Sequence, residues 1–366
     1  MRNSSTLWIS LAVLSAGCST PQDARAPETT ETAVATAAPV EAAAASAAPS
    51  AEPAATVDPK AEAEAKKKAE EQKKLADDFA KLDKERASEK SRMSDPLRKE
   101  LADLSSKTFP NFKGALEAAM KAGYRTPGAK DRDAQRRPVD VLTFFQLKQD
   151  MQVLELDAGA GWYTELLAPV LKKKGKLTVA GPDPSGPTSE RSTLYGQRLR
   201  ALLDKAPELG DKVDYVVTDA NKGFAFDAKL HDSFDTVLAF RTLHNWQRRG
   251  VLDKNIAEVY AVLKPGGVFA VEAHRAKAGA DPKASAEKGY LPQDFVVERA
   301  KAAGFELGGT SEINANPKDT TDHPDGVWSL PPTLRGGDKD KDKFVAIGES
   351  DRMTLRFVKP KKAKKP

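Results

Sequence analysis

From Phe109 onward the chain alternates between short apolar runs and longer segments whose apolar residues recur at helical spacing. The apolar runs predict strands at 153–156, 176–180, 213–217, 234–240, 268–272, 305–308 and 352–358. Helices are expected at 163–171, 190–203, 250–263 and 292–303, with two shorter helical pieces around Phe112 and Leu142. Strands that alternate with helices predict an α/β fold, a doubly wound and mostly parallel sheet with helices on both faces.

The chain before this region has a different pattern. Residues 19–59 are mostly Ala, Pro, Thr, Ser and Glu without a periodic apolar face, which predicts a disordered linker. Residues 60–107 are rich in helix-forming residues, and no Pro or Gly interrupts 60–92. Only Leu75, Phe79, Leu82 and Met93 suggest an apolar seam, so we expect a charged, solvated helical spacer and not a coiled coil.

The N-terminus has the features of an export signal. Arg2 precedes a short apolar run at 7–14, which is too short to span a bilayer, and small residues follow up to Cys18. The stretch Leu14-Ser-Ala-Gly-Cys18 resembles a bacterial lipoprotein signal over residues 1–18, which implies cleavage before Cys18 and lipid attachment at that cysteine. Ser19 then favours the periplasmic face of the outer membrane. The alternative is an ordinary secretory signal with an incidental cysteine.

Charge and metal-type residues add little to this outline. The 58 Lys and Arg residues against 53 Asp and Glu residues give a net charge of +5, which does not indicate a nucleic-acid partner. The basic tail at 361–366 is expected to be a solvated end. The run Asp319, Asp322, His323 and Asp325 lacks the spacing of a calcium loop, as do the aspartates at 338–342, so both are expected to be solvated surface loops without metal. The long insertion at 314–343 is a candidate lid.

The candidate ligand site lies where the predicted strands end. Gly159 and Gly161 follow the first strand, where a backbone free of side chains can approach a ligand at a helix N-terminus. A dinucleotide fingerprint requires a third glycine, and this chain has Thr164 there, which argues against a dehydrogenase. Asp183 and Asp219 follow the second and third strands, at the places where a carboxylate can meet a ribose and an adenine.

Together these features resemble the class I S-adenosylmethionine-dependent methyltransferases, and more narrowly a family of predicted, often exported, bacterial methyltransferases. The resemblance covers roughly residues 109–360. It is carried by Arg132-Asp133, Arg137-Pro138, Gly161-Trp-Tyr-Thr-Glu-Leu-Leu-Ala-Pro169, Phe234-Asp-Thr-Val, Thr242-Leu-His-Asn-Trp246, Leu263-Lys-Pro-Gly-Gly267, Glu272-Ala-His-Arg275 and Leu355-Arg-Phe-Val-Lys-Pro360. It implies a Rossmann-like seven-stranded sheet whose last strand is antiparallel, over residues 108–360, and S-adenosylmethionine as cofactor. The implied cofactor-binding residues are Glu155, Asp157, Gly159, Gly161, Asp183 and Asp219, with Asp157 in place of the usual first glycine.

Two histidines are the candidate catalytic groups. His244 and His274 follow the fourth and fifth strands, at the expected ligand edge, and an imidazole can accept a proton near neutral pH. Either could instead be a structural residue that fixes a loop. Tyr163, Asn245, Trp246 and Glu272 are candidate pocket walls, with core packing favoured for Trp246. We therefore expect a methyltransferase that acts on a small-molecule acceptor. The alternative is a degenerate methyltransferase fold that serves as an envelope-tethered binding or scaffolding module, because the cofactor is made in the cytoplasm.

Overall fold

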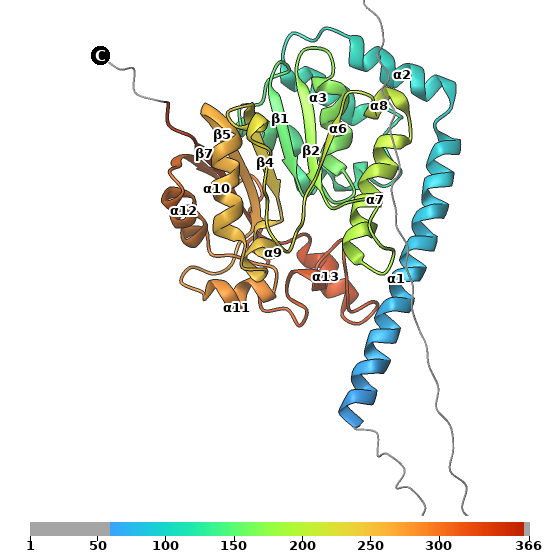
Figure 1. Cartoon of the computed structure of the whole chain (residues 1–366), viewed down its shortest axis with the longest axis vertical. Coiled ribbons are helices and arrows are strands. Elements are labelled where there is room, and N and C mark those ends of the chain that lie inside the picture. The colour runs from blue at the N-terminus through green and yellow to red at the C-terminus, as the bar shows by residue number, and fades with distance from the viewer. Residues whose placement is uncertain (1–58, 362–366) are drawn as a thin grey trace, which may run out of the picture. The chain divides into compact units, whose positions relative to one another are not determined.

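A computed structural model describes residues 59–361, which form one seven-stranded sheet with helices on both sides (Figure 1). The strand order is β3-β2-β1-β4-β5-β7-β6. β1 to β5 run parallel to one another, and β7 is antiparallel to both β5 and β6. The strands are β1 (Gln152–Leu156), β2 (Lys176–Gly181), β3 (Asp214–Val217), β4 (Phe234–Phe240), β5 (Leu263–His274), β6 (Glu306–Ser311) and β7 (Arg352–Val358). The predicted fold, a Rossmann-like mostly parallel sheet with an antiparallel last strand, is confirmed.

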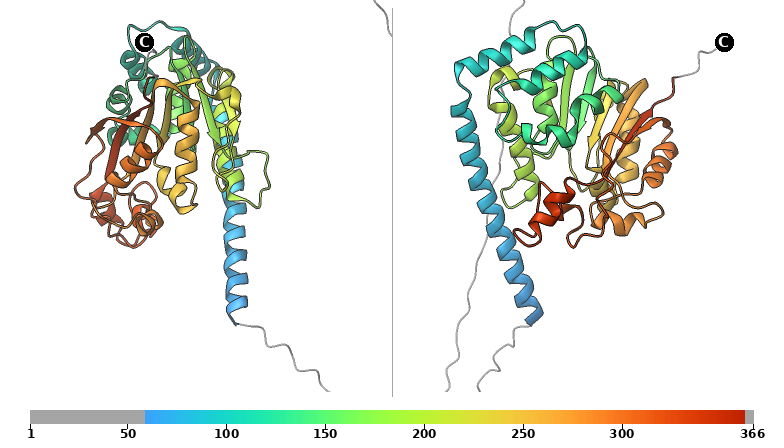
Figure 2. Two further views of the ribbon diagram at one scale, coloured as in Figure 1. Left: turned by 60° about the vertical axis from the view of Figure 1, so that its left-hand side comes forward. Right: turned by 180° about the vertical axis from the view of Figure 1, so that it is seen from behind.

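Two hydrophobic cores lie on the two faces of the sheet. On one face, Val153 of β1 packs with residues of α3 (Phe112–Lys121), α5 (Pro138–Phe144), α6 (Trp162–Leu171) and α7 (Arg191–Asp204). On the other, Leu154 and Leu156 pack with α9 (Leu243–Arg248), α10 (Leu252–Val262) and α12 (Gln293–Ala302). Successive β1 residues alternate between the two cores because side chains in a strand point to opposite faces. The view from behind in Figure 2 shows the helices of the first face.

The elements that the sequence did not predict are short. They are α4 (Asp133–Arg136), α8 (Pro207–Gly210), α9, α11 (Pro282–Glu287), α13 (Lys341–Ile347) and the 3₁₀ turns 130–132, 228–230 and 326–329. None is long enough to show two turns of apolar periodicity. β5 is also longer than predicted, because its backbone is already extended through the Lys-Pro-Gly-Gly stretch that we expected to end the preceding helix.

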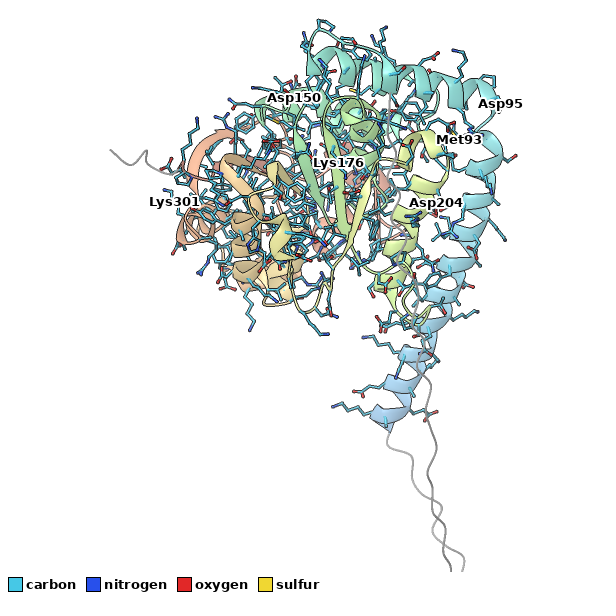
Figure 3. The ribbon with its side chains drawn as sticks, turned by 45° about the horizontal axis from the view of Figure 1, so that its top comes forward. Met93, Asp95, Asp150, Lys176, Asp204 and Lys301 are labelled. Atoms are coloured by element: carbon cyan, nitrogen blue, oxygen red, sulfur yellow. The ribbon has the colours of Figure 1, made fainter. Side chains whose placement is uncertain are left out.

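The charged N-terminal segment forms two helices, α1 (Pro59–Arg92) and α2 (Asp95–Ser106), and Figure 3 labels Met93 and Asp95 at the break between them. The first part of α1, residues 60–74, is exposed as expected for a spacer. The second part is not: Leu75 and Leu82 are buried in a cluster with Leu194 of α7. The interpretation as a solvated spacer is wrong for this part, because three apolar side chains at helical spacing are enough to dock a helix on a neighbour.

Polar contacts also hold the C-terminal end of α1 against the α/β domain. Arg92 donates a 2.8 Å hydrogen bond to the backbone carbonyl of Tyr124, and the Glu89 carboxylate lies 3.8 Å from the buried ammonium group of Lys205. The signal sequence with Cys18, almost all of the linker and the basic tail lie outside the described residues. Within residues 59–361, no helix is long and apolar enough to cross a membrane.

Candidate functional site

In the loop between β1 and α6, every second residue has a positive φ: Asp157 (47°), Gly159 (61°) and Gly161 (79°). Gly161 is required for packing, since a Cβ there would lie 2.2 Å from Leu202 of α7. Gly159 is different, because a Cβ there would meet no atom within 4 Å. Gly159 therefore allows the left-handed backbone conformation, and the absence of a side chain leaves the loop open on the ligand side.

Asp157 occupies a left-handed conformation that aspartate tolerates better than most residues. Its carboxylate accepts hydrogen bonds from the hydroxyl of Thr242 and the indole N–H of Trp246, both at 2.7 Å. Thr242 and Trp246 belong to the segment after β4, and both are buried. The departure from the usual glycine thus gives a polar link between the ends of β1 and β4, and Trp246 is a core residue, as favoured by the sequence.

Glu155 lies on β1 one residue before the strand ends, and it is only 3% exposed. It accepts a 2.7 Å hydrogen bond from the Thr164 hydroxyl of α6. Burial raises the pKa of Glu155 to about 7, while the Thr164 hydroxyl and the nearby Arg136 and Arg241 oppose that rise. Thr164 stands where a dinucleotide-binding loop has its third glycine. Its buried hydroxyl anchors the carboxyl group of Glu155.

A cavity of about 640 Å³ opens at the carboxyl ends of the strands, above the β1–α6 loop. Its walls come from that loop, from the start of α9, from α7 through Tyr195 and Arg198, and from the insertion before β7 through Trp328 and Pro332. Figure 1 shows α9, α11 and α13 at this end of the sheet. The predicted lid segment thus contributes to the wall of the cavity.

Both predicted catalytic histidines line the cavity, with ring centroids 5.6 Å apart. The His274 Nδ1 lies 2.5 Å from the Ser350 hydroxyl, whereas the His244 Nδ1 is buried without a hydrogen-bond partner among the described residues. Burial lowers the pKa of His244 to about 3, and nearby Arg248 and Arg249 add to the effect. Burial also lowers the pKa of His274 well below its usual value. Both imidazoles are therefore neutral at pH 7.

Buried arginines are the residues that sequence reasoning missed. Arg136 is 3% exposed, and its Nε and Nη1 have no hydrogen-bond partner within the described residues. Burial, followed by repulsion from Arg241, lowers the pKa of Arg136 to about 8. Arg241 directly follows β4 with a φ of 56°; the residue is half-buried, and its buried Nε also lacks a described partner. Both line the cavity.

In a neighbouring set of charges, by contrast, every member has an ion-pair partner. Glu349 accepts hydrogen bonds from Arg132, at 2.7 and 2.8 Å, and from Arg352. Arg352 also lies 3.0 Å from Glu272, whose other oxygen accepts a 3.3 Å hydrogen bond from the Tyr163 hydroxyl. These pairs join the segment before β1, β5 and β7 around one side of the cavity.

Asp183 and Asp219 follow β2 and β3 as predicted, yet both are exposed and neither lines the cavity. Asp183 accepts a 2.8 Å hydrogen bond from the Ser185 N–H, and Asp219 accepts bonds from the N–H groups of Asn221 and Lys222. Each carboxylate orders its own turn. Their role towards a ligand stays a prediction.

The expected solvated loop at 319–325 is wrong for two of its residues. Asp319 and His323 are buried, and the His323 Nε2 lies 2.8 Å from the Asp319 Oδ1. Asp319 also accepts hydrogen bonds from the Tyr290 hydroxyl, at 3.1 Å, and from the Asp351 N–H, at 2.9 Å. These bonds anchor the insertion to the body of the protein. No cluster of three or more metal-type residues occurs in the described part of the chain.

A comparison of the sequence with known protein families matches part of the chain around the cavity. Residues 154–271 match a methyltransferase domain. The matched segment begins in β1 and ends in β5, so it contains the β1–α6 loop, Asp183, Asp219 and His244. The match supports S-adenosylmethionine as the cofactor. No curated protein matches the chain.

Solved methyltransferase structures resemble the chain only distantly. An S-adenosylmethionine-dependent methyltransferase from Aquifex aeolicus has 16% identity and a TM-score of 0.41, with 69% of this chain and 100% of that chain covered. A Burkholderia thailandensis 1,6-didemethyltoxoflavin N1-methyltransferase with bound S-adenosylhomocysteine has 16% identity and a TM-score of 0.36, with 63% and 80% covered. Likeness at this level carries no conclusion about activity or acceptor.

Proposed function

We propose that this protein transfers the methyl group of S-adenosylmethionine to a small-molecule acceptor held in the cavity above the β1–α6 loop. The observation that carries the proposal is the position of this cavity. It is bounded by a glycine loop within the matched methyltransferase domain and also by two neutral histidines. Methyl transfer is an in-line displacement, so the protein needs to orient the two reactants and accept a proton from the acceptor.

We infer that His244 is the proton acceptor. Its ring makes no hydrogen bond with the described residues, whereas His274 is engaged with Ser350. A neutral imidazole is in the form that can take a proton, and its low pKa would rise once a ligand brings negative charge near it. His274 is then a positioning residue beside it.

Calorimetric titration with S-adenosylhomocysteine tests the cofactor site. We expect saturable binding to the unaltered protein and weaker binding to Asp183→Ala, because the ribose loses a carboxylate partner. Asp214→Ala is the matched control, since Asp214 is an exposed aspartate at the opposite end of β3, paired with Lys176. Absence of binding would refute the proposed function. Binding without methyl transfer to any acceptor would instead favour the degenerate-fold alternative.

We further propose that the chain is a lipoprotein anchored through Cys18, on the periplasmic face of the outer membrane. The support is the sequence Leu14-Ser-Ala-Gly-Cys18 after an apolar run. A lipid anchor requires no membrane contact by the catalytic domain. Expression of the full chain with radiolabelled fatty acid should label the unaltered protein and not Cys18→Ser; equal labelling of the two would contradict this assignment.

A further inference from the structure

Arg136 and Arg241 present guanidinium groups to the cavity without a protein partner. The guanidinium carbon of Arg136 lies 4.4 Å from the centroid of the Trp162 ring, which offers no hydrogen-bond acceptor oxygen. Within residues 59–361, the buried Nε and Nη1 of Arg136 and the buried Nε of Arg241 have no hydrogen-bond partner. A buried guanidinium without acceptors is costly, and proteins retain such groups where a ligand supplies the acceptors.

The carboxylates near these arginines have other partners, and Glu272, which attracts Arg241, is paired with Arg352. Glu349 accepts bonds from Arg132 and Arg352, and Asp157 accepts two bonds from the β4 end. Glu155 is held by Thr164. Both arginines therefore line the cavity without an ion-pair partner among the described residues.

The cofactor alone does not match two such groups. S-adenosylmethionine carries one carboxylate but also an ammonium and a sulfonium, so it brings net positive charge into the cavity. Even a cofactor carboxylate bound to one guanidinium fork in bidentate fashion would leave the second fork beside further cations. A second ligand with negative charge would satisfy that fork and offset the repulsion.

Arg241 also connects this charge to the proposed chemistry. It lies in the same segment as His244, three residues before it, and it acts on the pKa of both histidines by repulsion. An oxyanion bound to Arg241 would reduce this repulsion and make the imidazoles better proton acceptors. Occupation of the acceptor site would thus prepare the base for the reaction.

We propose that Arg136 and Arg241 bind an oxyanion, a carboxylate or phosphate group, of the methyl acceptor. The inference rests on the proposed function in one respect: it takes the second ligand to be the methyl acceptor. It narrows the substrate class to small acids, with the group to be methylated placed towards His244.

The test uses inorganic phosphate and acetate as probes on the full-length protein saturated with S-adenosylhomocysteine, at constant ionic strength set with chloride. We expect saturable binding of at least one anion and a rise in the melting temperature of the unaltered protein. Arg136→Gln and Arg241→Gln should each weaken anion binding by about tenfold, the effect of one lost charged hydrogen-bonding group. Arg249→Gln, which changes an exposed arginine of the same segment, should leave it unchanged.

A second set of titrations separates the acceptor's anion from the carboxylate of the cofactor. It compares S-adenosylhomocysteine with 5′-methylthioadenosine, which lacks the amino-acid part. We expect both to bind the arginine variants as well as they bind the unaltered protein. If both variants weaken only S-adenosylhomocysteine, and phosphate competes with it, the arginines hold the cofactor and the inference is overturned.

The remaining outcomes are also decisive. If neither anion binds or raises the melting temperature of the unaltered protein, the inference fails even where a variant does not fold. If phosphate binds through the two arginines but S-adenosylhomocysteine does not bind at all, the anion site stands and the proposed function fails.

Discussion

Replacement of Asp157 by glycine would restore the residue usual in methyltransferase loops, and we expect it to destabilise the protein. The carboxylate accepts bonds from Thr242 and Trp246, whose side chains are buried. Loss of two hydrogen bonds to a charged acceptor costs about 1.5–3 kcal/mol each. Relief of the left-handed conformation returns about 1 kcal/mol, part of which the greater unfolded-state entropy of glycine cancels. The expected net loss is about 3 kcal/mol.

Thermal unfolding followed by circular dichroism measures this loss. For a domain of this size, about 3 kcal/mol corresponds to a melting temperature lower by about 6–12 °C. Asp340→Gly is the matched control, because Asp340 has a φ of 54° and is exposed, and its side chain makes no capping bond. That variant should melt within about 3 °C of the unaltered protein.

A third variant separates hydrogen bonding from charge. Asp157→Asn keeps an acceptor oxygen in the same conformation, so it should lose about half as much as Asp157→Gly. The reasoning is refuted if Asp157→Gly melts at or above the temperature of the unaltered protein, because the link between β1 and β4 would then contribute nothing.

Three further predictions concern other parts of the structure. Leu82→Ala should cost about 2–3 kcal/mol in a denaturant titration because it leaves a cavity between α1 and α7, whereas the exposed Lys81→Ala should cost nothing measurable. Arg136→Met should raise the melting temperature of the ligand-free protein, since it removes a buried charge without acceptors; a lower melting temperature would mean that the guanidinium is satisfied. Stability should fall as the pH is lowered from 6.5 towards 3, because unfolded His244 takes up a proton that the folded imidazole resists. In His244→Gln, urea titrations between pH 4 and 6 should show a slope smaller by up to about 1.4 kcal/mol per pH unit, and an unchanged slope would contradict the burial of a neutral imidazole.

Strands and long helices were predictable because their signals are local. β4 was predicted at its observed bounds, 234–240, since its apolar residues at 234 and 237–240 form a short segment that suits a buried strand. α9 has six residues and could not show a helical period, although it carries His244. The placement of the two histidines in one cavity was predictable for a related reason: parallel strands bring their carboxyl ends to one edge.

The buried arginines were not predictable in this way. A charged residue is exposed in most proteins, so Arg136 and Arg241 carry no local sign of burial. Their environment depends on contacts between segments far apart in the chain, such as the bond from Arg132 to Glu349, 217 positions away. The same holds for Asp319 and His323, which looked like surface residues in an acidic stretch until the fold enclosed them.

One side of the cavity is therefore shaped by local turns and the other by contacts between distant segments. This difference affects how an acceptor would be selected. The first side consists of the β1–α6 loop, whose conformation is set by its own left-handed residues, together with Tyr195 and Arg198 of α7. On the other side, where we propose that the acceptor binds, the segment before β1 and the insertion before β7 meet through Glu349 and its two arginine partners. Glu349 keeps Arg132 and Arg352 neutralised, so on this side Arg136 and Arg241 remain without an ion-pair partner among the described residues. A change in the insertion would alter which arginines are free while the cofactor loop stays intact. Acceptor specificity would then change without loss of cofactor binding.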